Sequence, residues 1–217
     1  MKWSSMAKTV EGRTDKLLKY AAEEFLEMGY QEASLRVIAA KAGTTTGSIY
    51  SRFGDKAGLF NEIVGGTVEE LVHWFETGQQ SFAEKPAEEK KEEIFTYKPE
   101  LWEELVEYIY AHYEVFRLLV RCTDNDCFRE MADRIIDIEV KYTYQFLETT
   151  HNNAIAQGRL SPMLMHILSS AYYYGIFEPV RHEMTKEDAV VYVRQLRRFF
   201  VQGWMDLLGR TGDGSLS

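Results

Sequence analysis

Several residue types are scarce in this chain, and each scarcity excludes a class of protein. The 217 residues include four prolines and two cysteines. The cysteines, Cys122 and Cys127, are too few for the disulfide framework of a small secreted domain. No apolar run reaches the roughly 18 residues of a membrane-spanning helix, so we expect no membrane partner. The segment MKWSSMAKTVEGR lacks the apolar core of a secretory signal, which favours a cytoplasmic location.

Catalytic and metal-binding patterns are also missing. The five histidines form no HxxxH or HExxH pair, the spacing with which one helix binds zinc. Cys122 and Cys127 form a Cys-x4-Cys pattern without a second pair. This pattern indicates a turn between helices, with Asp126 as a cap, more than a metal site. Without a phosphate-binding glycine loop or a nucleophile elbow, we expect no enzyme, no metal and no cofactor.

The net charge of −9 is unevenly distributed along the chain. Residues 1–56 hold nine Lys/Arg against seven Asp/Glu, so the acidic excess lies in the remainder. A mildly basic head on an acidic body is compatible with DNA binding, because attraction to phosphate falls off within a Debye length. The basic excess is too small to indicate DNA binding by itself.

Apolar residues recur with helical period, which together with the few prolines predicts an all-α fold. The first expected helix covers residues 14–28, with Thr14 as its N-cap. Its apolar stripe consists of Leu17, Leu18, Ala21, Ala22 and Phe25. Gly29 suits the left-handed position after the helix, and Tyr30 can fold back onto it.

Residues 35–60, LRVIAAKAGTTTGSIYSRFGDKAGLF, have the layout of a helix-turn-helix followed by a third helix. We expect one helix over residues 35–42, capped by Ser34. A second helix is expected over residues 45–53, capped from within Thr44–Thr46. In a helix-turn-helix, this second helix enters the major groove of DNA.

The helical period assigns roles within the second helix. Ile49 and Phe53 lie four residues apart and face the other helices of the head. Gly47 permits a close approach to the groove, which gives a reason for a glycine inside a helix. The small polar residues point the other way, toward DNA.

The stretch SLRVIAAKAGTTTGSIYSRFGDKAGLF closely resembles the DNA-binding segment of TetR-type (tetracycline repressor-like) transcriptional regulators. The resemblance implies a three-helix head over residues 1–55. It also implies that Tyr50 and Lys56 contact phosphates, which set register rather than sequence choice. The positions implied for base or groove contact are Arg36, Thr45, Thr46, Ser48 and Ser51.

Residues 56–209 read as a larger helical bundle for effector binding and dimerisation, followed by a disordered tail over 210–217. Gly65-Gly66 interrupts the helix that begins at Lys56 and predicts either a kink or close helix packing. The charged stretch 84–93 reads as a solvated linker or exposed helix start. The remaining helices are expected over 99–111, 113–122, 126–152, 162–182 and 185–209, with caps at Ser161 and Thr185.

The last helix is apolar on two faces, so one face needs a partner outside its own subunit unless the chain is one monomeric core. One stripe consists of Val193, Leu196, Phe200, Trp204 and Leu207, and a second of Tyr192, Phe199, Met205 and Leu208. The resemblance implies that the last two helices form a four-helix dimer interface, and we assign the first stripe to it.

Aromatic residues are frequent in the body and can line a cavity for a flat or lipophilic effector, although such residues more often form core. The candidates are Trp102, Tyr108, Phe116, Tyr142, Phe146, Tyr173 and Phe177. Four carboxylates can attract a cationic effector through charge, beside the cation–π attraction of the rings: Glu103, Glu107, Glu139 and Glu178.

The sequence therefore predicts a homodimeric repressor that binds a palindromic DNA operator and is released by an unknown small molecule. The alternative is a helical small-molecule-binding protein whose head no longer reads DNA. Salt-sensitive, sequence-selective duplex binding separates the two hypotheses, because only the first requires it.

Overall fold

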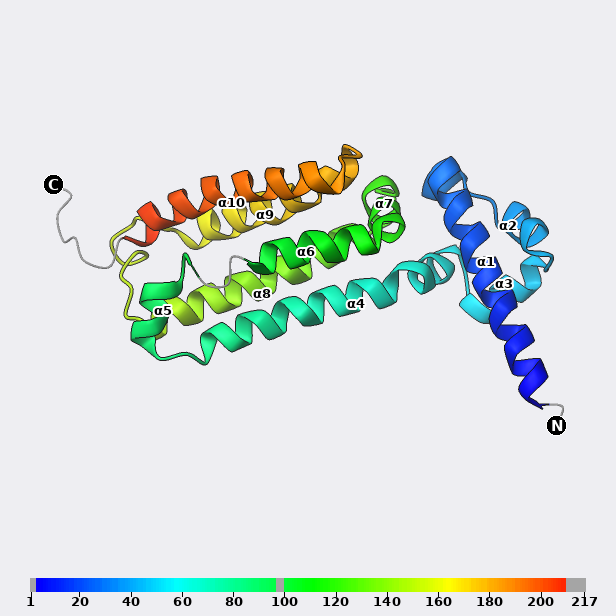
Figure 1. Ribbon diagram of the computed structural model, residues 1–217, viewed down its shortest axis with the longest axis horizontal. Helices are drawn as coiled ribbons and strands as arrows, with labels where there is room; N and C mark the ends of the chain where they lie inside the picture. The colour runs from blue at the N-terminus through cyan, green and yellow to red at the C-terminus, as the bar shows by residue number, and fades with distance from the viewer. Residues whose placement is uncertain (1–2, 97–99, 210–217) are drawn as a thin grey trace. The chain divides into compact units, whose positions relative to one another are not determined.

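The computed structural model describes residues 3–96 and 100–209, and every regular element in these ranges is an α-helix (Figure 1). The helices belong to two compact units. The first unit contains the described chain up to Glu69 together with Tyr113–Phe128, and the second contains Glu70–His112 and the chain from Arg129 onward. The expected division after residue 55 precedes α4 (Lys56–Ala83), whereas the compact units divide inside this helix. The expected tail over 210–217 lies outside the described residues.

The first unit begins with α1 (Trp3–Glu32), which starts well before the expected residue 14. Thr14 therefore lies inside the helix and is not its N-cap. Gly29 interrupts the helix as predicted, with φ 78° and ψ 168°, a backbone region that essentially only glycine enters. After this break Tyr30 turns back, and its ring stacks on Phe25 with centroids 5.8 Å apart.

The first unit continues with α2 (Leu35–Ala42), α3 (Thr46–Phe53), the start of α4, and α7 (Tyr113–Arg121). Its core is aromatic at the centre: Phe60 from α4 meets the Phe25 ring edge-on at 5.2 Å. Ile38 and Ile49 are fully buried in the same unit. The helix-turn-helix is thus held by contacts from helices on both sides of it in sequence.

The passage from α3 into α4 leaves no room for a side chain at position 58. The Asp55 carboxylate caps α4 by accepting a hydrogen bond from the Gly58 amide at 2.8 Å. A Cβ atom on Gly58 would lie 1.8 Å from the Phe53 carbonyl oxygen. The tight passage from one helix into the next therefore requires a residue without a side chain at position 58.

The second unit holds the rest of α4 with α5 (Ala87–Glu93), α6 (Glu100–Ala111), α8 (Cys127–Thr149), α9 (Pro162–Arg181) and α10 (Lys186–Leu208). The last two helices lie side by side (Figure 1). Their predicted caps are confirmed: Ser161 Oγ accepts from the Leu164 amide at 3.1 Å, and Thr185 Oγ1 from the Asp188 amide at 3.2 Å. Across the described ranges, no helix is both long and apolar enough to cross a membrane.

The kink expected at Gly65-Gly66 is absent, and the expectation for the charged stretch 84–93 holds only in part. The backbone stays helical through Gly65 and Gly66, without a kink. The charged stretch 84–93 contains α5, and Lys90 in it is only 3% exposed. Its ammonium donates to the Ala83 carbonyl at 3.2 Å and to Thr149 Oγ1 at 2.8 Å. Lys90 thus satisfies acceptors near the ends of two helices, which no charge pattern reveals.

We predict that Gly58→Ala destabilises the first unit by about 1–3 kcal/mol, because the added methyl group overlaps a backbone oxygen. Gly66→Ala is the matched control in the same helix, since nothing lies within 4 Å of its Cβ position. This control should gain roughly 0.5–1 kcal/mol from helix propensity. Urea unfolding followed by circular dichroism measures both changes. Equal midpoints for the two variants would contradict the steric argument.

Candidate nucleic-acid interface and ligand cavity

The two helix ends that flank the turn of the helix-turn-helix have backbone groups with hydrogen-bond partners. Gly43 ends α2 in the left-handed conformation, with φ 68° and ψ 37°, and its amide reaches the Ala39 and Ala40 carbonyls. Thr45 then begins α3: its Oγ1 accepts a hydrogen bond from the Ser48 amide at 3.2 Å. This is the cap that the sequence predicts. Ile49 is fully buried beneath α3, so the opposite side of the helix is presented outward.

The start of α2 is capped by a residue that sequence reasoning missed. Ser34 occupies the N-cap position, but its side chain makes no capping hydrogen bond. The Glu24 carboxylate of α1 instead accepts from the Ser34 amide at 3.3 Å and from Lys41 Nζ at 3.1 Å. The bond to Glu24 raises the pKa of Lys41. The sequence signal for this cap was a carboxylate within the apolar stripe of α1. Its hydrogen-bond partners lie 10 and 17 residues away in the chain, beyond the range of a local pattern.

The residues expected to face DNA differ in their accessibility. Arg36, Thr45, Tyr50 and Ser51 are exposed, and Thr46, Ser48 and Lys56 are half-buried. Tyr50, 54% exposed, is the large apolar side chain that α3 leaves open. Arg52, the one arginine of α3, donates to Thr14 Oγ1 of α1 at 2.5 Å.

Lys56 is engaged within the head. Its ammonium donates to the Gln31 carbonyl at 2.8 Å and the Ala33 carbonyl at 3.3 Å, and lies 5.1 Å from the centroid of the Tyr30 ring. An ammonium has three N–H donors, and two of them have carbonyl acceptors here. One donor is therefore left for a phosphate unless Lys56 changes its rotamer.

The second unit contains a partly open cavity of about 670 Å³ lined from α4, α6, α8, α9, α10 and the residues after α5. This is within the range of drug-sized ligand sites. Four of the aromatic residues expected to bind ligand line it: Trp102, Tyr142, Phe146 and Tyr173. Because the lining residues come from several helices, the periodicity of one helix could not identify all of them.

The other three expected ligand residues lie elsewhere. Phe116 is fully buried in the first unit, and Phe177, 2% exposed, belongs to the core of the second. Tyr108 donates to Glu70 Oε2 at 3.0 Å and packs against the His112 ring. All three are aromatic residues on helical stripes, and that pattern does not distinguish core or surface from cavity wall.

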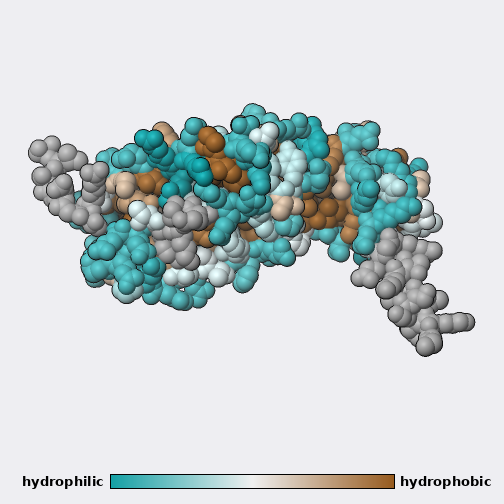
Figure 2. Space-filling view, in the orientation of Figure 1, coloured by the Kyte–Doolittle hydropathy of each residue, from teal (hydrophilic) through white to brown (hydrophobic). Residues whose placement is uncertain are grey.

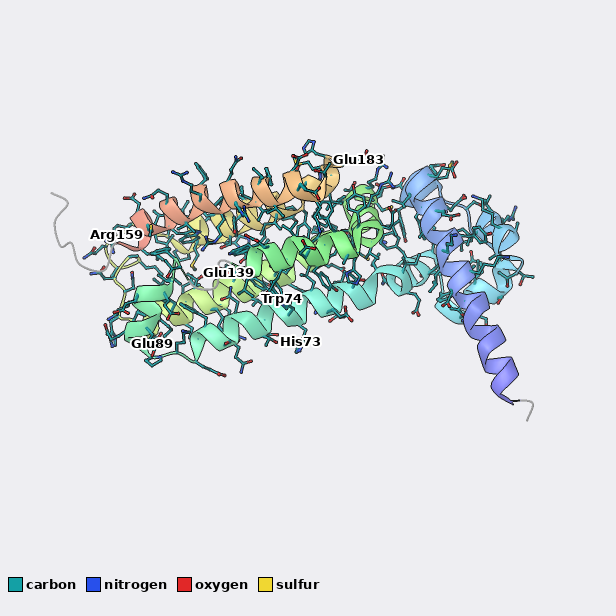
Figure 3. All side chains as sticks on the ribbon, in the orientation of Figure 1. His73, Trp74, Glu89, Glu139, Arg159 and Glu183 are labelled. Atoms are coloured by element: carbon teal, nitrogen blue, oxygen red, sulfur yellow. The ribbon has the colours of Figure 1, made fainter. Side chains whose placement is uncertain are left out.

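Glu139 of α8 and Glu70 of α4 are the carboxylates that line the cavity; Glu139 is labelled with Trp74 and His73 of α4 in Figure 3. Its Oε2 accepts from Gln79 Nε2 at 2.6 Å and from the Tyr173 hydroxyl at 2.7 Å. Burial raises the pKa of Glu139, and hydrogen bonds from Tyr173, Thr143 and Gln79 oppose the shift. Burial likewise raises the pKa of Tyr173 well above its usual value.

The stripe assigned to a dimer interface faces its own subunit. Val193 is buried against Val106, and Leu196 packs within 3.1 Å of the Cβ position of Gly175 in α9. The other members of the stripe, Phe200, Trp204 and Leu207, pack on Tyr172 or on the core cluster around Leu208. Val193 therefore leaves almost no surface for a second chain.

Both cysteines are free thiols. Cys122 is buried in the first unit, 3.6 Å from the Phe25 carbonyl oxygen, and burial raises its pKa to about 11. The Cys127 thiol lies 2.8 Å from Asn61 Oδ1. Among the residues that the structure describes, no three His, Cys, Asp or Glu side chains are grouped to hold a metal ion.

The short α2, the tight Gly43 turn and the outward-facing α3 define the first unit as a helix-turn-helix head on an all-helical protein. Residues 17–63 match the family model of the bacterial regulatory proteins of the tetR family. This match covers the helix-turn-helix and the helices on either side of it, so the described head is similar to the DNA-binding segment of that family.

Two curated relatives match the same part of the chain. The HTH-type transcriptional repressor KstR2 of Rhodococcus jostii (strain RHA1) is 38% identical over 60 residues, which is 28% of this chain and 29% of that protein. The HTH-type transcriptional repressor BepR of Brucella suis biovar 1 (strain 1330) is 41% identical over 59 residues, 27% of this chain and 28% of that protein. The alignments thus span under a third of these relatives' lengths.

One solved structure is similar over most of the chain. It is NalD, the secondary repressor of the MexAB-OprM multidrug efflux pump in Pseudomonas aeruginosa. The comparison covers 89% of this chain and 96% of that chain, with a TM-score of 0.53 and 21% identity. At this identity the likeness establishes the fold alone.

We predict that Glu24→Ala destabilises the head by about 1–3 kcal/mol, because the Ser34 amide loses its acceptor. Glu24→Gln, which keeps a carbonyl oxygen, should lose less. The control is Glu23→Ala on the same helix: Glu23 is exposed and pairs only loosely with Lys19 at 3.9 Å, so the change should stay within about 0.5 kcal/mol. Chemical denaturation gives the free energy of unfolding of the three variants. A loss of stability in Glu23→Ala as large as that in Glu24→Ala would contradict the prediction.

Proposed function

We propose that this protein is a transcriptional repressor without enzymatic activity, which binds a palindromic DNA operator as a homodimer and is released by a small molecule. The observation that carries the proposal is the outward-facing α3, capped by Thr45 and seated on Ile49, within the segment that matches the TetR family. Repression by the two curated relatives, which match over this same segment, supports it. Action on DNA would place the protein in the cytoplasm.

DNA reading would fall to the exposed side of α3 and the start of α2. Thr45, Thr46, Ser48 and Ser51 are small hydroxyl residues that can bond to base edges or touch thymine methyl groups. The Cβ position of Gly47 has only Thr45 Oγ1 near it, at 3.8 Å. The fold therefore does not require a glycine there, and close approach to DNA remains the reason we propose for it. Arg36, exposed at the start of α2, adds a long cationic contact.

Phosphate contacts would come from Tyr50 and Lys56. The Tyr50 side chain is exposed on α3, and its hydroxyl can donate to a phosphate oxygen. Lys56 keeps one donor beyond its two carbonyl partners. Both contacts act on the backbone of any duplex and so contribute affinity without sequence preference.

Dimerisation would use the faces of α9 and α10 that the subunit leaves open. Met163 and Ile167, one turn apart on α9, are 67% and 53% exposed. On α10, Val191 is 52% and Phe199 75% exposed. Figure 2 shows hydrophobic residues at the surface over α10. Exposed apolar side chains on two adjacent helices fit a symmetric interface with a second copy, which a palindromic operator needs.

Release would follow if the ligand that fills the cavity favours one arrangement of the dimer over another. The cavity lies within the second unit and is lined by α9 and α10, the helices of the proposed interface. A ligand shifts such an equilibrium only by its difference in affinity for the two states. An effector that prefers the state with mismatched heads would therefore lower operator affinity.

The second candidate is a ligand-binding protein whose head no longer reads DNA. The engagement of Lys56 with the Gln31 and Ala33 carbonyls favours it, because a phosphate must compete with those acceptors. Selection of bound duplexes from a random library decides between the two. A two-fold symmetric consensus supports the repressor, and no enrichment at low salt supports the alternative.

We predict that Lys56→Ala weakens binding to all duplexes and lowers the slope of log affinity against log salt by about 1. Ser48→Ala should instead change which bases are selected, because we propose that its side chain faces the bases, and its capping role uses only the backbone amide. Lys186→Ala is the control, since this lysine pairs with Glu107 in the body. Fluorescence anisotropy at several salt concentrations measures the slopes. A change in the selected consensus for Lys56→Ala would contradict its assignment as a phosphate contact.

We predict that Phe199→Asp converts a dimer into a monomer with unchanged helix content, because a charge replaces the most exposed apolar side chain of α10. Gln145→Asp, at an exposed position of α8, is the control and should stay dimeric. Sedimentation equilibrium gives the masses, and circular dichroism tests the fold. A Phe199→Asp protein that remains a dimer would place the interface elsewhere.

A further inference from the structure

We propose that the cavity of the second unit takes a lipophilic cation with a single positive charge, for which Glu139 is the counter-charge. The inference rests on the proposed function in treating this ligand as the effector, and it deepens that function by naming the effector's chemical class.

Among the described residues, Glu139 is held by neutral donors only. Gln79 of α4, Thr143 of α8 and Tyr173 of α9 donate to it, and none of them carries a positive charge. The basic side chains that line the cavity are His73 and Arg197, and neither is among the causes that shift the pKa of Glu139. A carboxylate in such a site has hydrogen bonds but no charge partner, and a cation supplies one.

The other carboxylates considered for a cation are already paired outside the cavity. Glu103 accepts two hydrogen bonds from Arg194, the shorter at 2.6 Å. Glu107 pairs with Lys186 at 3.0 Å, and Glu178 with Arg181 at 3.3 Å. The structure thus singles out Glu139 from the four.

The walls beside Glu139 suit a lipophilic cation. Aromatic rings reach the cavity from five helices, among them Trp74, Phe75, Trp102, Tyr142 and Trp204. The face of an aromatic ring attracts a cation electrostatically, and more strongly when water is excluded. A bulky organic cation can therefore fill the apolar volume and still meet negative potential on several sides.

A second feature of the cavity favours a ligand with one positive charge. The Tyr172 hydroxyl is buried and has no hydrogen-bond partner among the described residues. Of the charged groups near it, Arg197 is the one whose effect on the Tyr172 pKa is largest. A second cationic group there would meet like charge, whereas an oxygen acceptor would satisfy the hydroxyl and the guanidinium.

The test uses two probes of the same shape and opposite charge, tetraphenylphosphonium and tetraphenylborate. Isothermal titration into the full-length protein, without DNA, measures both affinities. We expect the phosphonium to bind about tenfold or more tightly than the borate, because shape and apolar contact are equal and only the charge differs. Equal affinities, tighter binding of the borate, or no binding of the phosphonium would each overturn the proposal.

The variant Glu139→Gln removes the charge and keeps the shape of the side chain. It should weaken phosphonium binding about tenfold and leave borate binding unchanged or improved. Glu148→Gln is the matched control, on the same helix at an exposed position, and should change neither. If Glu139→Gln fails to fold, the comparison of the two probes on the unaltered protein still decides the question.

Failure of this inference is distinguishable from failure of the proposed function. Charge-selective phosphonium binding without any selected operator would support the cation site and reject the repressor. A selected operator, together with equal affinities for the two probes, would support the repressor and reject the cation site. Where both hold, addition of the phosphonium to the operator complex should lower fluorescence anisotropy, and Glu139→Gln should raise the required concentration about tenfold.

Discussion

An eight-residue helix is not stable alone in water, because its few hydrogen bonds do not offset the cost of nucleation. The α3 helix is of this length, so it exists only through what holds it in place. Thr45 satisfies the Ser48 amide at one end, Gly54 turns the chain with a positive φ of 80° at the other, and Ile49 is buried beneath. The surface that we propose faces the DNA groove therefore depends on the packing of the head around α3.

Glu24 is buried and Glu139 is partly buried at the cavity wall, and their surroundings give the two carboxylates different roles. Glu24 meets a backbone amide and the Lys41 ammonium, so its charge is paired and it serves to join α1 to α2. Glu139 meets an amide and two hydroxyl groups, all neutral, inside a cavity of aromatic rings. Burial without a charge partner costs stability, and such a cost is understandable where a ligand completes the site.

Local signals in the sequence predicted much of the secondary structure. Ser161 before Pro162, and Thr185 three residues before Asp188, mark helix starts that the structure confirms. Such caps act between residues three apart, so the sequence contains all the information they need. Thr14 and Ser34 failed as caps because neighbours beyond that range decided the outcome: the helix continues to Trp3 in one case, and Glu24 supplies the acceptor in the other.

The sequence by itself determined the all-helical fold and the helix-turn-helix, because helical period, glycine turns and caps are short-range properties. Only the tertiary structure decided which apolar residues of α10 are open. It placed Phe199 outside and Val193 inside, although both are apolar residues of one helix. Of the four candidate carboxylates, it placed Glu139 at the cavity. It also placed Tyr142, but not Phe177, in the cavity wall. Periodicity shows that a helix has an apolar face, whereas which neighbour covers that face depends on contacts between residues far apart in the chain.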